Sequence, residues 1–294
     1  MKFNKKIIII TIIIILINII YFLYDSHLNE TFINHVNDNN NNDNDNAIPS
    51  IQPYVLYIPK REKYIKNVMN KLGINKLGKE NINVKYILGP PKENIIMEQL
   101  HNKDMISDSY YEKNKKEGTG EVAVFLGHVE ILETFLKSDH DYALIFEDDI
   151  FLPNEEEKQK EINIKIKNII KNIPAEAEIL YFGYCFEDCK KSKVYKKNPT
   201  LFKHAIRPVC LHSYLVSKKG AKILLREIIP LSDGLDVVIL GLINKKIINA
   251  FTVNNDYLQI LQNRKELGSD ISNMNHAADI PTCIIGNWTG NPRN

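Results

Sequence analysis

This chain has few cysteines and little net charge. Four cysteines among 294 residues are too few for a disulfide-rich scaffold, and they lack the Cys-x-x-Cys spacing of a paired zinc site. Lysine and arginine (38) nearly balance aspartate and glutamate (36), and a net charge of +2 is too small for a protein held by phosphate backbones. We therefore expect no nucleic-acid partner. Hydrophobic residues make up 44%, which is enough for a core and excludes a wholly disordered chain.

A long apolar run stands at the N-terminus. Three lysines precede residues 7–24, which are apolar except for Thr11 and Asn18. As a helix this run would span roughly 27 Å, enough for a thin bilayer. The lysines would remain on the cytoplasmic side. A cleaved signal peptide is the alternative, but the small-residue cleavage site is missing. The sequence thus predicts a cytoplasmic tip and signal anchor over residues 1–24 of a single-pass type II membrane protein, with its main domain in the lumen of the secretory pathway (ER or Golgi).

The next segment is poor in apolar residues. Positions 37–46 read NDNNNNDNDN, which cannot bury enough surface to offset the entropy of ordering. We expect residues 25–50 to be a disordered stem, although a compositionally biased genome would explain the asparagines equally well. Residues 51–294 are expected to form one folded domain.

Short apolar runs and helical patterns alternate after residue 51, which is typical of an α/β domain with a largely parallel sheet. Helices are expected where apolar residues recur at helical spacing, with a glycine stop at Gly73 and a serine cap at Ser217. The predicted strands are 54–58, 84–88, 142–146, 179–184 and 211–216, and the predicted helices are 61–72, 121–137, 162–173 and 217–227.

Three consecutive acids, Glu147, Asp148 and Asp149, directly follow the predicted strand 142–146. Adjacent carboxylates repel one another, so a cation is expected nearby. Ligands of open α/β sheets collect at the carboxyl ends of strands, and hard oxygen ligands favour Mn²⁺ or Mg²⁺. A metal-bound diphosphate would fit this position. A solvated acidic turn that binds nothing is the alternative.

Several motifs follow one another in a recognisable order. They are YVLYIPKR (54–61), GEVAVFLGH (120–128), DYALIFEDD (141–149), CLHSYLVSKKGAKILL (210–225), Asp236 and SDI (269–271). Together they resemble glycosyltransferase family 25, which includes lipopolysaccharide sugar transferases and collagen hydroxylysine galactosyltransferases. The resemblance spans about residues 53–271.

The resemblance implies a GT-A-like, Rossmann-type domain that transfers a sugar with inversion. The expected donor is a UDP-sugar carrying galactose or glucose, the cofactor Mn²⁺ (or Mg²⁺), and the acceptor a glycan or a collagen-like hydroxylysine. Glu147 would lie near the ribose, Asp149 on the metal, and Asp148 on the metal or the sugar.

Four further residues complete the expected site. Asp236 is the first candidate for the base that deprotonates the acceptor hydroxyl, and Asp270 is the second. His128 would bind donor or metal, unless it is a hydrogen-bonded helix histidine. Arg61 would pair with a donor phosphate, unless it is an ordinary surface arginine. Tyr214 is expected to be a core residue.

The chain departs from the family pattern near the donor site. The pattern has Gly-Cys, Ser-His, an aromatic residue and Asn-Leu where this chain has Ala123-Val124, Gly127-His128, Leu132 and Pro59. A lumenal glycan- or collagen-binding protein without turnover therefore stays an alternative, as does a metal-dependent phosphodiesterase. Because the three acids are retained, we favour an active transferase.

Two further features depend on a lumenal location. Asn29-Glu30-Thr31 and Asn287-Trp288-Thr289 are N-glycosylation sequons, which predict a glycoprotein. Cys185 and Cys189 are close enough in sequence for a local disulfide, although free buried thiols are the alternative.

Overall fold

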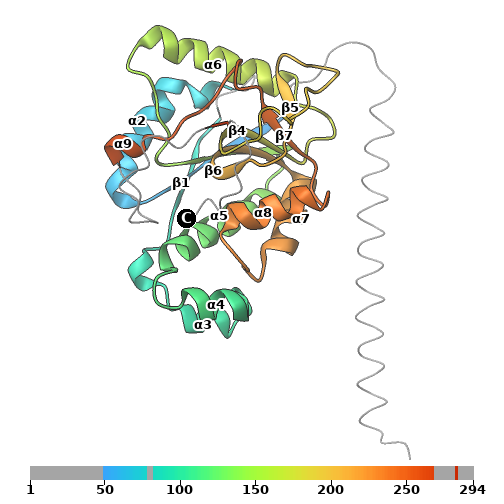
Figure 1. Cartoon of the computed structure of the whole chain (residues 1–294). Coiled ribbons are helices and arrows are strands. Elements are labelled where there is room, and N and C mark those ends of the chain that lie inside the picture. The colour runs from blue at the N-terminus through green and yellow to red at the C-terminus, as the bar shows by residue number, and fades with distance from the viewer. Residues whose placement is uncertain (1–48, 78–81, 268–281, 284–294) are drawn as a thin grey trace, which may run out of the picture. The chain divides into compact units, whose positions relative to one another are not determined.

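The computed structural model describes residues 49–77, 82–267 and 282–283 (Figure 1). Its strands are β1 (Ile51–Tyr57), β2 (Lys85–Leu88), β3 (Tyr142–Glu147), β4 (Ile179–Cys185), β5 (Phe202–His204), β6 (Val209–Ser217) and β7 (Ala250–Val253). Its α-helices are α2 (Glu62–Leu72), α3 (Met97–His101), α4 (Asp108–Asn114), α5 (Thr119–Leu136), α6 (Glu156–Lys171), α7 (Lys218–Ile228), α8 (Leu235–Asn244) and α9 (Arg264–Leu267), and short 3₁₀ turns stand at 59–61, 74–76 and 92–94.

The described strands form one seven-stranded sheet in the order β2-β1-β3-β6-β4-β7-β5. β1, β2, β3, β4 and β7 run in one direction, and β6 and β5 run against them. The expected mixed α/β class is confirmed. Fewer of the strand pairs are parallel than expected, because β6 lies between β3 and β4 and pairs antiparallel with both.

Helices cover both faces of the sheet (Figure 1). α5, α7 and α8 pack on one face, and α2 and α6 pack on the other. β3 shows why: Ala143 and Ile145 belong to the cluster under α5, while Leu144 and Phe146 belong to the cluster under α2 and α6. A strand buried on both faces reads as a continuous apolar run, and each fully buried large side chain contributes about 1.5–3 kcal/mol.

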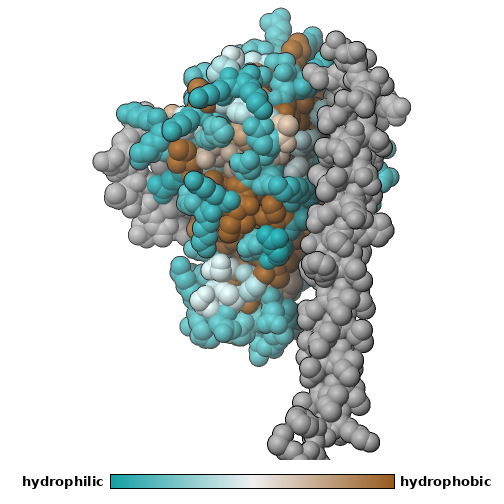
Figure 2. Space-filling view, turned by 90° about the vertical axis from the view of Figure 1, so that its right-hand side faces the viewer, coloured by the Kyte–Doolittle hydropathy of each residue, from teal (hydrophilic) through white to brown (hydrophobic). Residues whose placement is uncertain are grey.

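The side of the domain that faces the viewer in Figure 2 has an apolar area between more hydrophilic regions. α8 is mainly apolar, and its buried residues are Leu235, Ile239, Leu242 and Ile243. Its remaining apolar side chains, Val237, Val238 and Leu240, are only half-buried.

The expected elements are present, and most of their ends are displaced by no more than about three residues. Gly73 ends α2 in the left-handed region (φ 59°), and the Ser217 hydroxyl accepts the Gly220 N–H (3.1 Å) at the start of α7. The main shift is in α6, which begins at Glu156. Sequence reasoning missed α3, α4, α8, α9, β5 and β7, of which β5 has only three residues and β7 only four.

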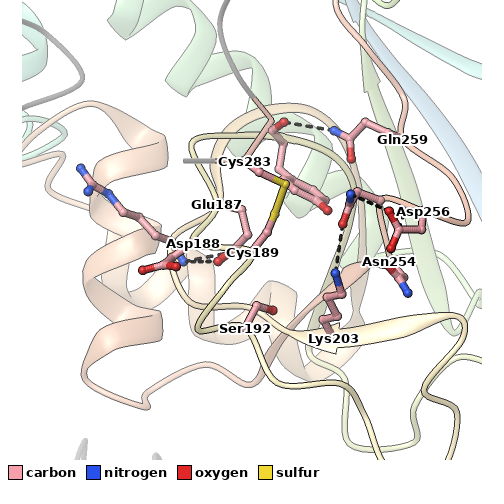
Figure 3. Close-up of a disulfide and its surroundings, with 12 residues drawn as sticks. Glu187, Asp188, Cys189, Ser192, Lys203, Asn254, Asp256, Gln259 and Cys283 are labelled. Atoms are coloured by element: carbon pink, nitrogen blue, oxygen red, sulfur yellow. Dashed lines mark hydrogen bonds between the residues drawn. A yellow bond between two sulfur atoms is a disulfide. The ribbon is translucent and has the colours of Figure 1, made fainter. Parts of the chain in front are cut away.

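The disulfide expectation is wrong. Cys185 is bonded to Cys210, and Cys189 is bonded to Cys283. Strand pairing explains the first bond, because β4 pairs Cys185 with Val209 of β6 and brings Cys210 within a Cα–Cα distance of 5.7 Å. Figure 3 shows the second bond beside Glu187 and Asp188. Contacts between distant segments therefore decided the pairing of the four cysteines.

Several expectations concern residues outside the described ranges. They are the anchor over 1–24, nearly all of the stem over 25–50, the sequons at Asn29 and Asn287, and Asp270. Within the ranges that the structure describes, no helix combines the length and apolar character needed to cross a bilayer.

Candidate functional site

The candidate site lies where β1, β3 and β4 end, at the carboxyl edge of the sheet. Glu147 is the last residue of β3, and Leu56 of β1 stands beside it in the ladder. The chain after β7 returns to this edge, where the Phe151 N–H donates to the Leu261 carbonyl and Ile150 bridges Gln262. Three segments that are far apart in sequence thus surround the acids, at the edge where α/β sheets bind ligands.

Asp148 is paired with a cation from its own chain. Arg61 Nη1 lies 2.8 Å from Asp148 Oδ1, and both residues are buried. The other carboxylate oxygen accepts the Ile58 N–H (2.7 Å). Burial raises the pKa of Asp148, while Arg61 and the Ile58 N–H oppose that rise. Arg61 joins the start of α2 to the turn at residues 147–149 and also donates to the Leu267 carbonyl (3.3 Å). Its expected contact with a donor phosphate stays a prediction.

Glu147 is held by a buried histidine. His128 Nε2 on α5 lies 3.1 Å from Glu147 Oε1, and His128 Nδ1 lies 3.0 Å from the Tyr214 hydroxyl on β6. Burial raises the pKa of Tyr214, which keeps its hydroxyl protonated and able to donate to Nδ1. The tautomer that satisfies both contacts carries its proton on Nε2 and donates it to Glu147.

His128 and Glu147 differ in access to solvent. The His128 side chain is 0% exposed and both ring nitrogens have protein partners, whereas the Glu147 side chain is 18% exposed. The His128 imidazole is thus enclosed by protein. Its geometry corresponds to the alternative of a hydrogen-bonded helix histidine, and it acts on the site through Glu147.

Asp149 faces an amide group. Gln262 Nε2 lies 3.1 Å and 3.4 Å from the two carboxylate oxygens, and the Asn263 N–H donates to the Asp149 carbonyl. The Gln262 amide orients the Asp149 carboxylate. Because Mg²⁺ and Mn²⁺ typically take one or two protein carboxylates and complete their shell with phosphate and water, Asp149 suits such an ion.

The three acids do not act as one cluster. Among the described residues, the group of three or more ligand atoms that lie within 4.8 Å of one another consists of Cys185, Cys210 and His212, and the acids are not such a group. The two sulfur atoms are already joined in a disulfide. The expectation that Asp149 and Asp148 hold a metal ion stays a prediction; in the structure Asp148 is paired with Arg61 and Asp149 faces the Gln262 amide.

Asp236 lies at the same edge of the sheet, in the first turn of α8. Its Oδ2 accepts the Cys210 N–H (3.1 Å) and its Oδ1 accepts the Val237 N–H (2.9 Å). Because Cys210 stands near the start of β6, next to the end of β4, Asp236 belongs to the carboxyl edge. Its side chain is half-buried.

Sequence reasoning missed Gln262, Asn263 and Glu187. No local pattern marked the first two, which arrive through the return of the chain after β7. Glu187 had a weak signal, since it is an acid just after a predicted strand. It is 1% exposed, and its two oxygens accept the N–H groups of Ile206 and Arg207 (3.1–3.3 Å). Burial nevertheless raises the pKa of Glu187 to about 7.

Comparisons with known proteins agree with the sequence motifs. A family model described as glycosyltransferase family 25 (LPS biosynthesis protein) matches residues 51–239. No curated protein matches the chain. The apo-form glycosyltransferase GlyE of Streptococcus pneumoniae TIGR4 is 11% identical with a TM-score of 0.33, over 68% of this chain and 45% of that one. A glycosyltransferase involved in glycosylation of the major capsid of PBCV-1 is 10% identical with a TM-score of 0.27, over 60% of this chain and 66% of that one. With such low TM-scores, neither structure bears on the site.

Proposed function

Because this chain belongs to glycosyltransferase family 25, we propose that it is a metal-dependent, inverting hexosyltransferase with a GT-A-like domain. As a glycosyltransferase it takes a sugar donor and a glycan-type acceptor. The proposed donor is UDP-galactose or UDP-glucose, and the proposed acceptor is a hydroxyl of a glycan or of a collagen-like hydroxylysine. The observation that carries this proposal is the family match over residues 51–239, which includes the acids 147–149 and Asp236.

At the donor end, Asp149 would hold the ion, and Gln262 orients its carboxylate. Bound Mn²⁺ or Mg²⁺ would supply Lewis-acid stabilisation of the charge that grows on the leaving diphosphate. Glu147 would accept hydrogen bonds from the ribose hydroxyls. The Tyr214–His128–Glu147 chain of hydrogen bonds keeps that carboxylate in one orientation, which reduces the entropy lost when the donor binds.

At the acceptor end, Asp236 would act as the general base. The acceptor oxygen attacks the anomeric carbon from the face opposite the diphosphate, its proton passes to Asp236, and UDP leaves with the electron pair of the broken bond. The Cys210 N–H holds one oxygen of Asp236 in place, and carboxylate oxygens have further lone pairs to accept the proton. Asp270 is the second candidate for this role.

The cellular setting is part of the same proposal. The lysine-flanked apolar run of residues 7–24 supports a type II signal anchor, and the two sequons support a glycoprotein with its catalytic domain in the ER or Golgi lumen. Two disulfides among the described residues are consistent with an oxidising compartment.

The test is release of UDP from UDP-galactose and UDP-glucose with mixed acceptors and Mn²⁺. Asp149→Asn should lower metal-dependent turnover by about 100-fold or more with an unchanged melting temperature, because the amide keeps the shape but loses the charge that binds the ion. Asp139→Asn, an exposed acid before β3, is the matched control and should remain fully active.

Full metal-dependent turnover by Asp149→Asn would refute the metal assignment. Binding of UDP with neither transfer nor donor hydrolysis would instead favour the non-catalytic binding protein. Cleavage of phosphodiesters without a sugar acceptor would favour the phosphodiesterase.

A further inference from the structure

Positive charge is concentrated in one segment of this nearly neutral chain. Residues 189–207, here called the basic segment, contain six lysines and one arginine and no acidic residue. The net charge of the whole chain is only +2, so the remaining residues together carry −5. The basic segment is therefore a local feature and does not reflect a generally basic protein.

Five of the six lysines of the basic segment face solvent. Lys190, Lys191, Lys193, Lys196 and Lys197 are all exposed. Lys191 pairs with Asp188 (3.1 Å), whereas Lys190, Lys193 and Lys196 make no ion pair with any residue in the described ranges. α6 differs, because it contains both glutamates and lysines and forms pairs such as Lys165–Glu161 (2.7 Å). The basic segment thus presents cations that a partner can neutralise.

The backbone of the basic segment is fixed by long-range contacts. The Cys189–Cys283 disulfide holds its beginning (Figure 3), and the Ser192 hydroxyl donates to the His204 carbonyl (2.8 Å). Residues 193–195 pair with the backbone of β5, where the Tyr195 N–H donates to the Phe202 carbonyl (2.8 Å). The buried Tyr195 ring also packs edge-on against Phe251. Anchored backbone lowers the ordering cost that a partner would otherwise have to offset.

The basic segment is connected to the acceptor side of the proposed site through a disulfide and hydrogen bonds. It begins four residues after Cys185, whose disulfide partner Cys210 holds Asp236 through its N–H. Its other end, Arg207, donates its N–H to Glu187. In the sheet order, β5 stands four strands from β3, roughly 19 Å at the usual strand spacing. A chain of several sugars would be needed to reach from one to the other.

We propose that the lysines at 190, 193 and 196 bind an acceptor glycan that carries carboxylate or phosphate groups, several sugars away from the hydroxyl that is glycosylated. This inference rests on the proposed transferase function. A lipid surface is less suitable, because interfacial binding uses inserted apolar side chains and the one large apolar side chain exposed in the basic segment is Val194.

The experiment compares the variant K190Q/K193Q/K196Q with K160Q/K167Q/K171Q, which removes three lysines from α6. Both keep the Lys191–Asp188 pair. Affinity is measured by fluorescence anisotropy at low and high salt for polygalacturonate, which carries carboxylates, for polyphosphate, and for neutral dextran. Vesicles with and without phosphatidylserine are the membrane arm, and circular dichroism checks folding.

We expect the wild type to bind one or both anionic polymers but not dextran, with affinity that falls as salt rises. The basic-segment variant should bind about tenfold more weakly, and the α6 variant within about twofold of the wild type. Equal losses in both variants, binding to vesicles alone, or no binding to either polymer would overturn the proposal.

UDP release separates this proposal from the proposed function. The basic-segment variant should keep wild-type release with a small neutral acceptor, because its substitutions lie outside the catalytic groups. If no condition yields UDP release while the anionic polymers still bind through the basic segment, the transferase assignment fails and the binding surface stands. If turnover is normal and polymer binding is absent, only the binding surface fails.

Discussion

The three acids at residues 147–149 have different partners although they are adjacent in sequence. Asp148 is neutralised by Arg61, Glu147 accepts from His128, and Asp149 faces the amide of Gln262. Removing one partner of a buried ion pair usually costs about 3–5 kcal/mol, because the other charge is left uncompensated. Asp148 therefore stabilises the turn at residues 147–149, and the proposed chemistry is assigned to Glu147 and Asp149.

The raised pKa of Glu187 predicts an unusual pH dependence of the protein's stability. Its pKa of about 7 in the folded state is higher than the ordinary value of 4.5, so the folded state binds the proton more tightly than the unfolded state. The stabilisation is complete below pH 4.5 and is lost as the pH rises through 7. A pKa shift of this size corresponds to at most roughly 3–4 kcal/mol.

Glu187→Gln should remove this dependence, because glutamine resembles the protonated acid and can still accept the N–H groups of Ile206 and Arg207. Urea unfolding at pH 5 and pH 8 measures it: the wild type should lose more stability between these pH values than the variant does. Glu157→Gln, at an exposed position in α6, is the control and should behave like the wild type. A Glu187→Gln protein with the wild-type pH dependence would contradict the assignment.

Among the helices, α7 contains Gly220, although glycine is intrinsically unfavourable in a helix. A Cβ at Gly220 would overlap the Glu178 carbonyl oxygen just before β4. A Cβ at Gly241 of α8, in contrast, would meet no other described atom within 4 Å. The close approach of the backbone at residue 178 explains why residue 220 is glycine, and no contact explains Gly241.

Gly220→Ala should therefore destabilise the protein by about 2–3 kcal/mol or more, since overlap with backbone cannot be relieved by a rotamer change. Gly241→Ala should be neutral or stabilise by up to about 1 kcal/mol, because alanine restricts the unfolded chain and favours helix. Denaturant unfolding of the two variants measures both effects. Similar stabilities for the two variants would contradict the proposed contact between α7 and residue 178.

Elements with strong periodicity were predicted well, and short ones were not. α5 and the buried strand β3 carry patterns long enough to read from sequence. β5 and β7 form a ladder only because each lies beside the other and β7 also lies beside β4. The stability of such short strands comes from their neighbours, so their own residues contain little signal.

For the whole molecule, the two disulfides close loops of different length. The bond from Cys185 to Cys210 spans 25 residues, and the bond from Cys189 to Cys283 spans 94. In the chain-entropy description, these loops correspond to about 3.5 and about 4.7 kcal/mol of stabilisation. The longer connection ties the basic segment to a distant part of the chain.

Replacing both cysteines of one pair by serine should thus cost more stability for Cys189 and Cys283 than for Cys185 and Cys210. Denaturant unfolding without reductant measures the difference. Thiol titration of the unfolded, unreduced wild type should detect essentially no free thiol. Four titratable thiols would show that neither disulfide forms, and the order of the two double variants tests the loop-length argument separately.

Local patterns in the sequence determined the α/β class, most long elements, the motifs of the family and the position of the acids at a strand end. These features follow from side-chain periodicity and from residues close together in the chain. The tertiary structure decided the cysteine pairs, the partner of each acid and the hydrogen-bond partners of His128. The decisive contacts join residues 61 to 148, 128 to 214 and 149 to 262, about 86 to 113 positions apart. No short-range pattern can encode such contacts, because they exist only after the strands have taken their order in the sheet.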